Sequence, residues 1–142
     1  MEKLEMLELE LNALVRASKD NIVITDGKGI VLRASPNSNG IYGMDPLSLI
    51  GKSVTELEAE NVFSPSVTKR VLEERKEVQV MQYTATERSV MATGIPVFDE
   101  AGEIIRVISF SHDLTELQHL KEDYEELRTT MERYQSEIQE LR

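Results

Sequence analysis

The two histidines are the residues best suited to metal binding or proton transfer, because the chain contains no cysteine. Without cysteine, disulfides, thiolate metal sites and cysteine nucleophiles are excluded. His112 and His119 do not have metal-ligand spacing on one helix, so we expect both to be exposed or edge histidines and predict no metal site. The sequence also lacks a convergent set of acid, base and nucleophile, which argues against an enzyme.

Two short segments are similar to phosphate-handling motifs but lack essential residues. Gly51-Lys52-Ser53 copies the end of a nucleotide-binding P-loop, yet Pro46 stands where that motif needs its first glycine. We therefore expect Gly51 to end a short helix. "YEELRTTM" is similar to the phosphoacceptor segment of histidine kinases, but Glu125 replaces the histidine and Thr130 the proline. We predict no phosphotransfer on this helix, although an acceptor beyond Arg142 stays open.

Length and charge limit the possible partners. The 142 residues suit one compact domain with appended helices, and the net charge of -10 argues against direct nucleic-acid binding. No apolar run approaches the roughly 20 residues of a membrane span. The N-terminus does not resemble a signal peptide. We expect a cytoplasmic protein that contacts neither membrane nor nucleic acid.

The spacing of apolar and turn-forming residues divides the chain into three parts. Residues 1–18 form an amphipathic helix, whose apolar stripe consists of Leu4, Leu7, Leu11 and Leu14. Residues 19–113 form a domain, and residues 114–142 form a long helix. Within the domain, strands are predicted near 22–25, 30–33, 78–84, 89–98 and 104–111, with short helices near 46–49 and 66–76. This order predicts an α+β fold, a five-stranded antiparallel sheet with short helices on one face.

The closing helix carries apolar residues at alternating steps of three and four, which is typical of a coiled coil. These residues are Leu117, Leu120, Tyr124, Leu127, Met131, Tyr134, Ile138 and Leu141. With Leu117 at position a, a parallel homodimer pairs residue g of one chain with residue e of the next heptad in the other. The charged pairs are Glu116 with Lys121, Asp123 with Arg128 and Glu137 with Arg142, each an acid facing a base. The alternative is one helix packed on its own domain. Because the pattern stops within a heptad, we expect the chain to be a fragment of a longer protein.

The middle of the chain resembles a PAS domain over about residues 19–117. "NIVITDGKGIVLRAS" is similar to the opening PAS hairpin, and "YGMDPLSLIGKSVTEL" is similar to the following helical segment. "PVFDEAGEIIRVISFSHDLTEL" resembles the last two strands with their exit motif, here Asp113 and Thr115. The resemblance implies a PAS fold that senses a signal and passes it on through the closing helix.

More narrowly, "FSPSVTKRVLEERKEV", "TGIPVFDE" and the coiled tail resemble the N-terminal PAS segment of bacterial sigma-54-dependent transcription activators. That family implies an AAA+ ATPase and a helix-turn-helix domain after the PAS domain, and this sequence contains neither. The predicted function is a sensory and homodimerisation module of such a regulator. The alternatives are the PAS module of a sensor histidine kinase and a dimerisation domain without a ligand.

The resemblance also bears on cofactors. Photosensory flavin relatives carry an adduct-forming cysteine, which is missing here, and neither histidine lies on the helix that faces the usual pocket, as a haem ligand would. No cofactor is predicted, but a small-molecule effector is possible. By similarity to flavin-binding relatives and by strand alternation, the pocket candidates are Val23, Thr25, Tyr42, Met44, Phe63, Val67, Val71, Tyr83, Val107, Ser109 and Ser111. The alternative is that these residues only fill the core.

Ile108 and Phe110 should point to the opposite sheet face, which then needs a cover. The N-terminal leucine stripe is the obvious cover, from the same chain or from a second subunit. The predicted dimer interface therefore joins Leu4, Leu7, Leu11, Leu14, Ile108 and Phe110 to the apolar residues of the closing helix.

Overall fold

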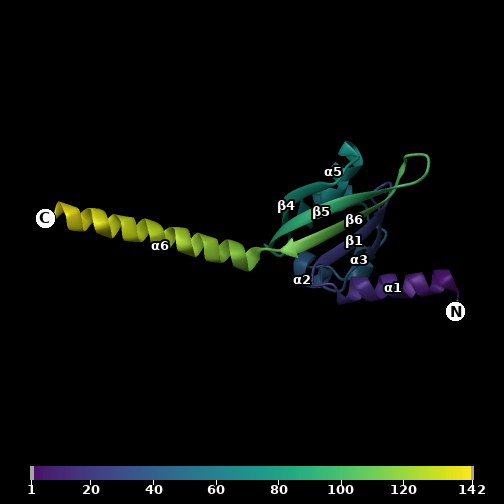
Figure 1. Ribbon diagram of the computed structural model, residues 1–142, viewed down its shortest axis with the longest axis horizontal. Helices are drawn as coiled ribbons and strands as arrows, with labels where there is room; N and C mark the ends of the chain where they lie inside the picture. Colours follow the sequence, from purple (N-terminus) through teal and green to yellow (C-terminus); the bar gives the residue numbers. More distant parts are fainter. Residues whose placement is uncertain (1, 142) are drawn as a thin grey trace.

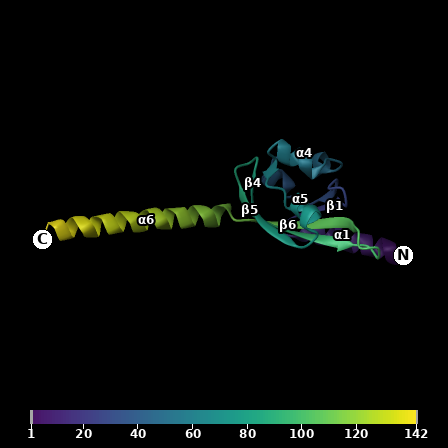
Figure 2. The same cartoon turned by 90° about the horizontal axis from the view of Figure 1, so that it is seen from above.

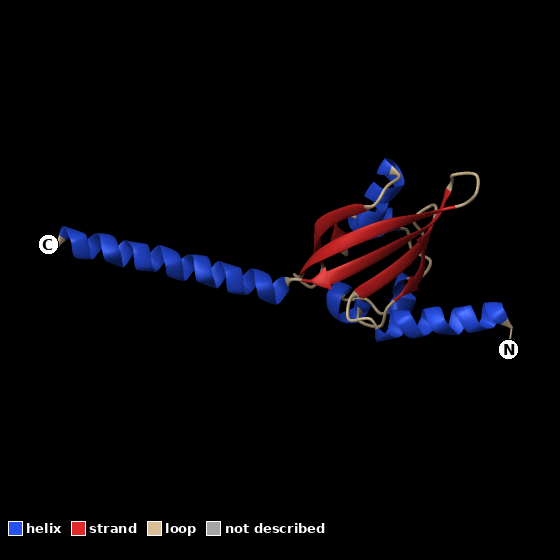
Figure 3. Ribbon diagram, viewed as in Figure 1, coloured by secondary structure: helices blue, strands red, loops and turns tan. Residues whose placement is uncertain are grey.

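The computed structural model describes residues 2–141 and shows a small domain with a long helix leaving it at one end (Figure 1). The helices are α1 (Lys3–Ala17), α2 (Ser38–Tyr42), α3 (Pro46–Leu49), α4 (Val54–Ala59), α5 (Val67–Glu74) and α6 (Thr115–Glu140). The strands are β1 (Asn21–Asp26), β2 (Val31–Ala34), β3 (Phe63–Ser64), β4 (Val78–Thr84), β5 (Ser89–Phe98) and β6 (Ile104–Asp113). Figure 3 shows the strands as one curled sheet, and the view from above in Figure 2 shows α4 and α5 on one face of it.

The sheet is antiparallel, with strand order β2-β1-β6-β5-β4-β3. The predicted α+β class is confirmed, but the sheet has six strands among the described residues and not five. The sixth is β3, in which Phe63 pairs with Thr84 and Ser64 pairs with Tyr83. Two residues are too few to show an alternating pattern, so this strand left no signal in the sequence.

The two predicted hairpin turns have the same construction. In the first, the Asp26 carboxylate accepts hydrogen bonds from the backbone N–H groups of Lys28 and Ile30, at 2.8 and 3.0 Å. Partial burial raises the pKa of Asp26, but these hydrogen bonds and nearby Arg106 outweigh it and hold the pKa below its usual value. In the second turn, Asp99 accepts from the N–H groups two and four residues onward, both at 2.9 Å. Aspartate therefore closes each turn by the same local hydrogen bonds.

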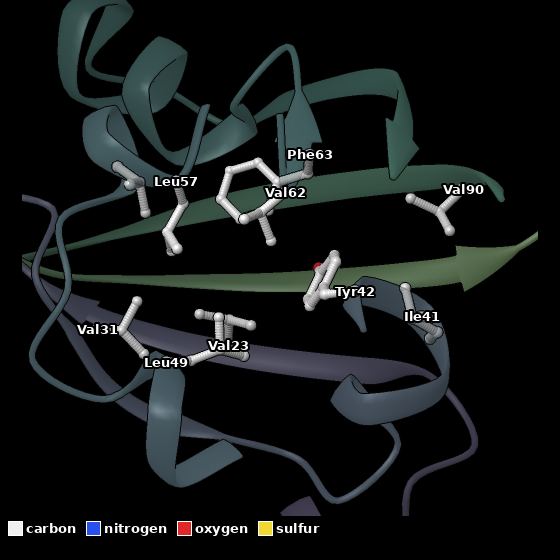
Figure 4. Packing of buried hydrophobic residues seen from close by; sticks show 10 residues of the cluster. Val23, Val31, Ile41, Tyr42, Leu49, Leu57, Val62, Phe63 and Val90 are labelled. Carbon is white, nitrogen blue, oxygen red and sulfur yellow. The ribbon is translucent and has the colours of Figure 1, made fainter. Parts of the chain in front are cut away.

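The main core lies between the sheet and the short helices, as Figure 4 shows. Strand alternation places Val23 and Val90 on this inner face, while Leu49 and Leu57 reach it from α3 and α4. The rings of Tyr42 and Phe63 lie in its centre, 5.4 Å apart and tilted by 58°. This tilted arrangement is one that aromatic pairs prefer.

The opposite, outer sheet face carries a smaller apolar cluster. Ile22, Ile24, Ile108 and Phe110 form it, as the alternation of β1 and β6 predicts, and Val15 from α1 covers it. The prediction that the leucine stripe covers this face is wrong within the single chain, because all four leucines stay exposed. The reason is the rotation of α1, which turns a different set of residues toward the sheet.

Helix α6 projects away from the domain and buries none of its residues, so it does not pack on its own domain (Figure 2). All eight apolar residues of its predicted seam are more than half exposed. Arg142, which the heptad pattern pairs with Glu137, lies outside the described residues, as does Met1. Over residues 2–141, no helix combines the length and the apolar character needed to cross a membrane.

Candidate functional site

The inner sheet face gathers the five pocket candidates that belong to β1 and β6. Val23, Thr25, Val107, Ser109 and Ser111 are all buried there. The register of β1 and β6 places Val23 opposite Ser109 and Thr25 opposite Val107. The Ser109 hydroxyl donates to the Val23 carbonyl at 3.3 Å, which satisfies its need for a buried partner.

A small cavity lies between this face and the helices. Its volume is about 10 Å³, and its wall includes the predicted residues Val23, Tyr42, Phe63, Val67 and Ser109. A single water molecule needs about 10–15 Å³ measured in this way. The cavity is therefore of the size of one water, and an organic ligand would require the surrounding side chains to move.

Six of the eleven pocket candidates lie outside this cavity wall, and three of them, Thr25, Val107 and Ser111, are buried elsewhere on the inner sheet face. Tyr83 is 65% exposed on the outer face, so its assignment to the pocket wall is wrong. The residue of β4 that lines the cavity is its neighbour Gln82, whose side-chain amide donates to the Pro65 carbonyl at 2.9 Å. Met44 is half-buried at the edge of the main core, and Val71 is buried beside Gly94.

Asn21 forms the centre of a buried polar network at the start of β1. Its side-chain oxygen accepts hydrogen bonds from the hydroxyls of Ser35, at 2.8 Å, and Ser38, at 2.9 Å. Its side-chain nitrogen has no hydrogen-bond partner among residues 2–141, although Asn21 is fully buried. Because Ser38 belongs to α2, the network fixes that helix against the beginning of the sheet.

Tyr42 connects the same network to the end of the sheet. Its hydroxyl lies 3.4 Å from the Ser111 hydroxyl, and Ser111 is the strand partner of Asn21. Burial raises the pKa of the Tyr42 phenol, so this group is a neutral hydrogen-bonding group near pH 7. The inner face thus carries a polar path from α2 to the last residues of β6.

The exit from β6 into α6 is held by the two predicted exit residues. The Asp113 carboxylate accepts hydrogen bonds from the Thr115 backbone N–H, at 3.0 Å, and from the Thr115 hydroxyl, at 2.7 Å. Its second oxygen accepts from the Arg88 guanidinium at 2.8 Å. The Thr115 hydroxyl in turn accepts from the Ser89 N–H at 3.0 Å. The start of α6 is therefore fastened to the beginning of β5.

These contacts also keep the Asp113 carboxylate charged at the joint between β6 and α6. Partial burial raises the pKa of Asp113, but the hydrogen bonds from Thr115 and the guanidinium of Arg88 outweigh it and hold the pKa below its usual value. The carboxylate therefore stays ionised at any pH near neutral.

The two histidines lie away from this cavity. His112 is exposed beside the exit, where its Nδ1 lies 2.9 Å from an Asp20 carboxylate oxygen. His119 is exposed on α6. Within the described part of the chain, no group of three or more possible ligands is arranged to hold a metal ion.

Three residues that build these sites were not found from the sequence. Asn21 lies on the same face of β1 as Val23 and Thr25, so strand alternation could have predicted that its side chain is buried there. Gln82 lies on the same face of β4 as Val80, but the apolar side chains of Met81 and Tyr83 suggest that the other face of the strand is the buried one. Arg88 lies before β5 and meets Asp113 only in the folded chain, so no local pattern indicates it.

Comparison with known proteins agrees with this architecture. A family model described as PAS domain matches residues 19–116, whereas comparison with curated proteins gives no match. The PAS domain of BvgS from Bordetella pertussis is similar with a TM-score of 0.59 and 20% identity, over 89% of this chain and 98% of that one.

Two further solved structures share the fold. The PAS domain of an HTR-like protein from Haloarcula marismortui has a TM-score of 0.54 and 20% identity, over 78% of this chain and 94% of that one. A sensory box sensor histidine kinase from Vibrio cholerae has a TM-score of 0.53 and 16% identity, over 79% and 94%. Because the family model covers more than half of the sequence, and the fold and its exit joint agree with it, the chain belongs to the PAS domain family of sensory domains.

Proposed function

We propose that this PAS domain is the sensory and homodimerisation module of a sigma-54-dependent transcriptional regulator in the cytoplasm. It relays the state of its core through a parallel coiled coil to an AAA+ ATPase. The observation that carries the proposal is the seam of α6, whose apolar residues all lie exposed on a helix that contacts the domain only at its start. A continuous apolar stripe of this kind needs a partner in water, and the acid–base g–e pairs specify a second copy in parallel.

The joint at Asp113 gives the mechanism a physical basis. Arg88 and Ser89 hold the first turn of α6, so a change in the curl of the sheet moves the helix with it. An effector or partner protein that binds one packing of the core more tightly shifts the population toward that packing. In a dimer, the same shift changes the register or the separation of the two α6 helices.

The output domain is assigned from the sequence resemblance, which singles out sigma-54-dependent activators. A sensor histidine kinase is the second candidate, because a parallel helix pair would serve it equally well. A chimera test distinguishes the two candidates. Residues 1–142 are joined in heptad register either to the ATPase and DNA-binding domains of a sigma-54 activator or to a kinase core. Helix-dependent control of transcription by the first chimera supports the proposal, whereas control of the kinase alone contradicts it.

The dimer itself is tested by sedimentation and native mass spectrometry of the purified chain. Leu127→Glu places a charge in the middle of the seam, and we expect it to convert a dimer to a monomer at micromolar concentration. Thr129→Glu is the matched control, because it adds the same charge on the side of α6 opposite the seam. A wild-type monomer, or equal effects of the two substitutions, would contradict the proposal. An additional mass on each subunit would identify an effector.

A further inference from the structure

A groove lies on the outer side of the sheet, where α1 packs against β2. Asn12 and Val15 of α1 line one side of it, and Arg33 of β2 and Arg106 of β6 line the sheet side. Its volume is about 430 Å³, against about 10 Å³ for the cavity inside the core. Pockets that bind small molecules measure roughly 300–1,000 Å³. The folded domain therefore has room for a small ligand between α1 and the sheet, and not in its core.

The sheet turns two arginines toward this groove. Arg33 pairs with Ile24 on one side of β1. On the other side, Ile24 pairs with Ile108, and Arg106 lies two residues before Ile108 in β6. Because Ile24 and Ile108 belong to the outer cluster, strand pairing and alternation place both arginines on the outer face as well. Two guanidinium groups on one groove attract an anion, although the whole chain carries a net charge of -10.

Both guanidinium groups keep hydrogen-bond donors for a ligand. Arg33 donates to the Asn12 side chain, and a Glu8 carboxylate oxygen lies 3.8 Å from its other terminal nitrogen, beyond hydrogen-bond distance. Arg106 donates to the carbonyl of its neighbour Ile105 at 2.7 Å. A guanidinium has five N–H donors, so these contacts in the described part of the chain use only a minority of them.

Two acidic side chains compete for the arginines, and neither is firmly bound to them. The Asp26 carboxylate, near Arg106, already accepts the two backbone hydrogen bonds of its own turn. The Glu8 side chain is 65% exposed, and exposed ion pairs contribute little to stability. A ligand can therefore replace Glu8 on Arg33 at small cost.

The remaining wall indicates the class of ligand. Leu32 and Ile50 line the same groove and are partly exposed, so they offer an apolar surface beside the arginines. The planar guanidinium matches a carboxylate through two parallel hydrogen bonds. We propose that the groove binds a small organic carboxylate with a short apolar chain, which Arg33 and Arg106 hold by its charge and Leu32 and Ile50 by its chain.

A ligand in this groove contacts α1 and the sheet at once. Val15 is the one buried residue of α1 in the described chain, so the helix is held by few contacts of its own (Figure 1). A carboxylate that bridges α1 and the sheet favours the packing in which α1 lies on the sheet. Asp20, after α1, lies 2.9 Å from His112, before α6, which gives this change a route to the closing helix. The effect on α6 rests on the proposed function, whereas the binding does not.

Titration of the isotope-labelled chain with pentanoate tests the site, with backbone amide shifts as the measurement. We expect saturable shifts at Asn12, Arg33 and Ile50, while Ser109 in the core stays unchanged. Pentanamide has the same chain without the charge and should bind at least about tenfold more weakly, because the charge-assisted hydrogen bonds are lost. Acetate, which lacks the apolar chain, should also bind more weakly than pentanoate.

Matched variants test the assigned residues. Arg106→Gln should weaken pentanoate binding at least about tenfold, whereas Arg70→Gln removes the same charge from α5, on the other side of the sheet, and should leave it unchanged. Glu8→Gln should tighten binding about twofold, because the competing carboxylate is gone. Glu10→Gln, on the opposite side of α1, controls for the change in net charge and should have no effect.

Each contrary result overturns a defined part of the proposal. Binding weaker than the millimolar range overturns the site, and saturable shifts at Ser109 without shifts in the groove place the ligand in the core instead. Equal binding of pentanoate and pentanamide overturns the carboxylate class, and equal losses in Arg106→Gln and Arg70→Gln indicate a general charge effect. If pentanoate binds in the groove while sedimentation shows a monomer, the site stands and the proposed function fails. If the dimer forms without such binding, the opposite holds.

Discussion

Arg88 and Asp113 form an ion pair with a 2.8 Å contact that connects the residue before β5 to the last residue of β6. The same carboxylate caps the first turn of α6 through Thr115. The Asp113 side chain therefore holds the ends of the two central strands β5 and β6 and the start of α6 together, and its charge state matters for both.

The first prediction concerns Asp113→Asn. We expect the free energy of unfolding to fall by about 1 kcal/mol at pH 7, because charge-assisted hydrogen bonds at a partly exposed site are lost. The first turn of α6 should also exchange its amide hydrogens faster. Urea titration and hydrogen-exchange mass spectrometry measure the two effects, and Glu122→Gln, on the side of α6 away from the seam, serves as the control.

The pH dependence of this difference has a definite sign. The folded pKa of Asp113 is lowered, so its contribution is complete above the unfolded value of about 3.9 and is lost as the pH falls through the folded pKa. The stability difference between wild type and Asp113→Asn should therefore be constant from pH 7 to about pH 5 and shrink in more acidic solution. A difference that grows with acid would contradict the assigned role.

The second prediction concerns the close approach of α5 to the sheet. A Cβ atom added at Gly94 would lie 2.7 Å from a methyl group of Val71 and 3.2 Å from one of Val67. Gly94→Ala should therefore destabilise the domain by about 1–3 kcal/mol through overpacking. Gly40→Ala is the control, because nothing lies within 4 Å of that position in α2, and it should be neutral or stabilising. If Val71→Ala does not recover part of the loss in the double variant, the clash is not its cause.

The third prediction concerns the buried network at Asn21. Asn21→Ala removes the acceptor shared by Ser35 and Ser38, and it should lower the free energy of unfolding by about 2 kcal/mol, since buried hydroxyls lose a partner. Asn39→Ala, an exposed asparagine on α2, should change it by less than about 0.5 kcal/mol. Thermal and urea unfolding compare the two variants. Similar small effects would show that the network does not stabilise α2.

The sequence predicted the parts of the molecule that depend on local periodicity. The five longer strands, the two aspartate turns and the helix α6 follow from spacing, and alternation together with the resemblance to flavin-binding relatives placed Val23, Ser109 and Ser111 on the inner face correctly. The resemblance to PAS domains supplied the order in which these elements assemble.

The errors occurred where local signals conflict or are missing. In residues 81–84, apolar Met81 and Tyr83 alternate with polar Gln82 and Thr84, so hydrophobicity suggested that Met81 and Tyr83 face the core. In the structure Gln82 and Thr84 are buried instead, and the pairing of β4 with β5 fixes this orientation. The rotation of α1 depends on Arg33 of β2, a contact between distant segments. The size of the cavity depends on how side chains from several elements pack, which no single stretch of sequence determines.

The last prediction tests by charge exchange whether the charged residues beside the α6 seam face each other in the dimer. In the proposed dimer, Glu116 and Asp123 of one copy face Lys121 and Arg128 of the other. A chain with Lys121→Glu and Arg128→Glu then has acids at all four of these positions. A chain with Glu116→Lys and Asp123→Lys has bases at all four. We expect each homodimer to be about tenfold weaker than wild type, because several like-charge pairs each cost a few tenths of a kcal/mol.

Mixing the two variant chains restores every acid–base pair in a parallel, in-register heterodimer. Native mass spectrometry should therefore show the heterodimer in excess over both homodimers, and the excess should decline at high salt as the charges are screened. Statistical mixing of the three species would contradict the proposed pairing of these charged residues across the seam. The residues on the outer side of α6 provide the control. Exchanging Glu122 and Arg133 for opposite charges should leave the distribution of dimers unchanged.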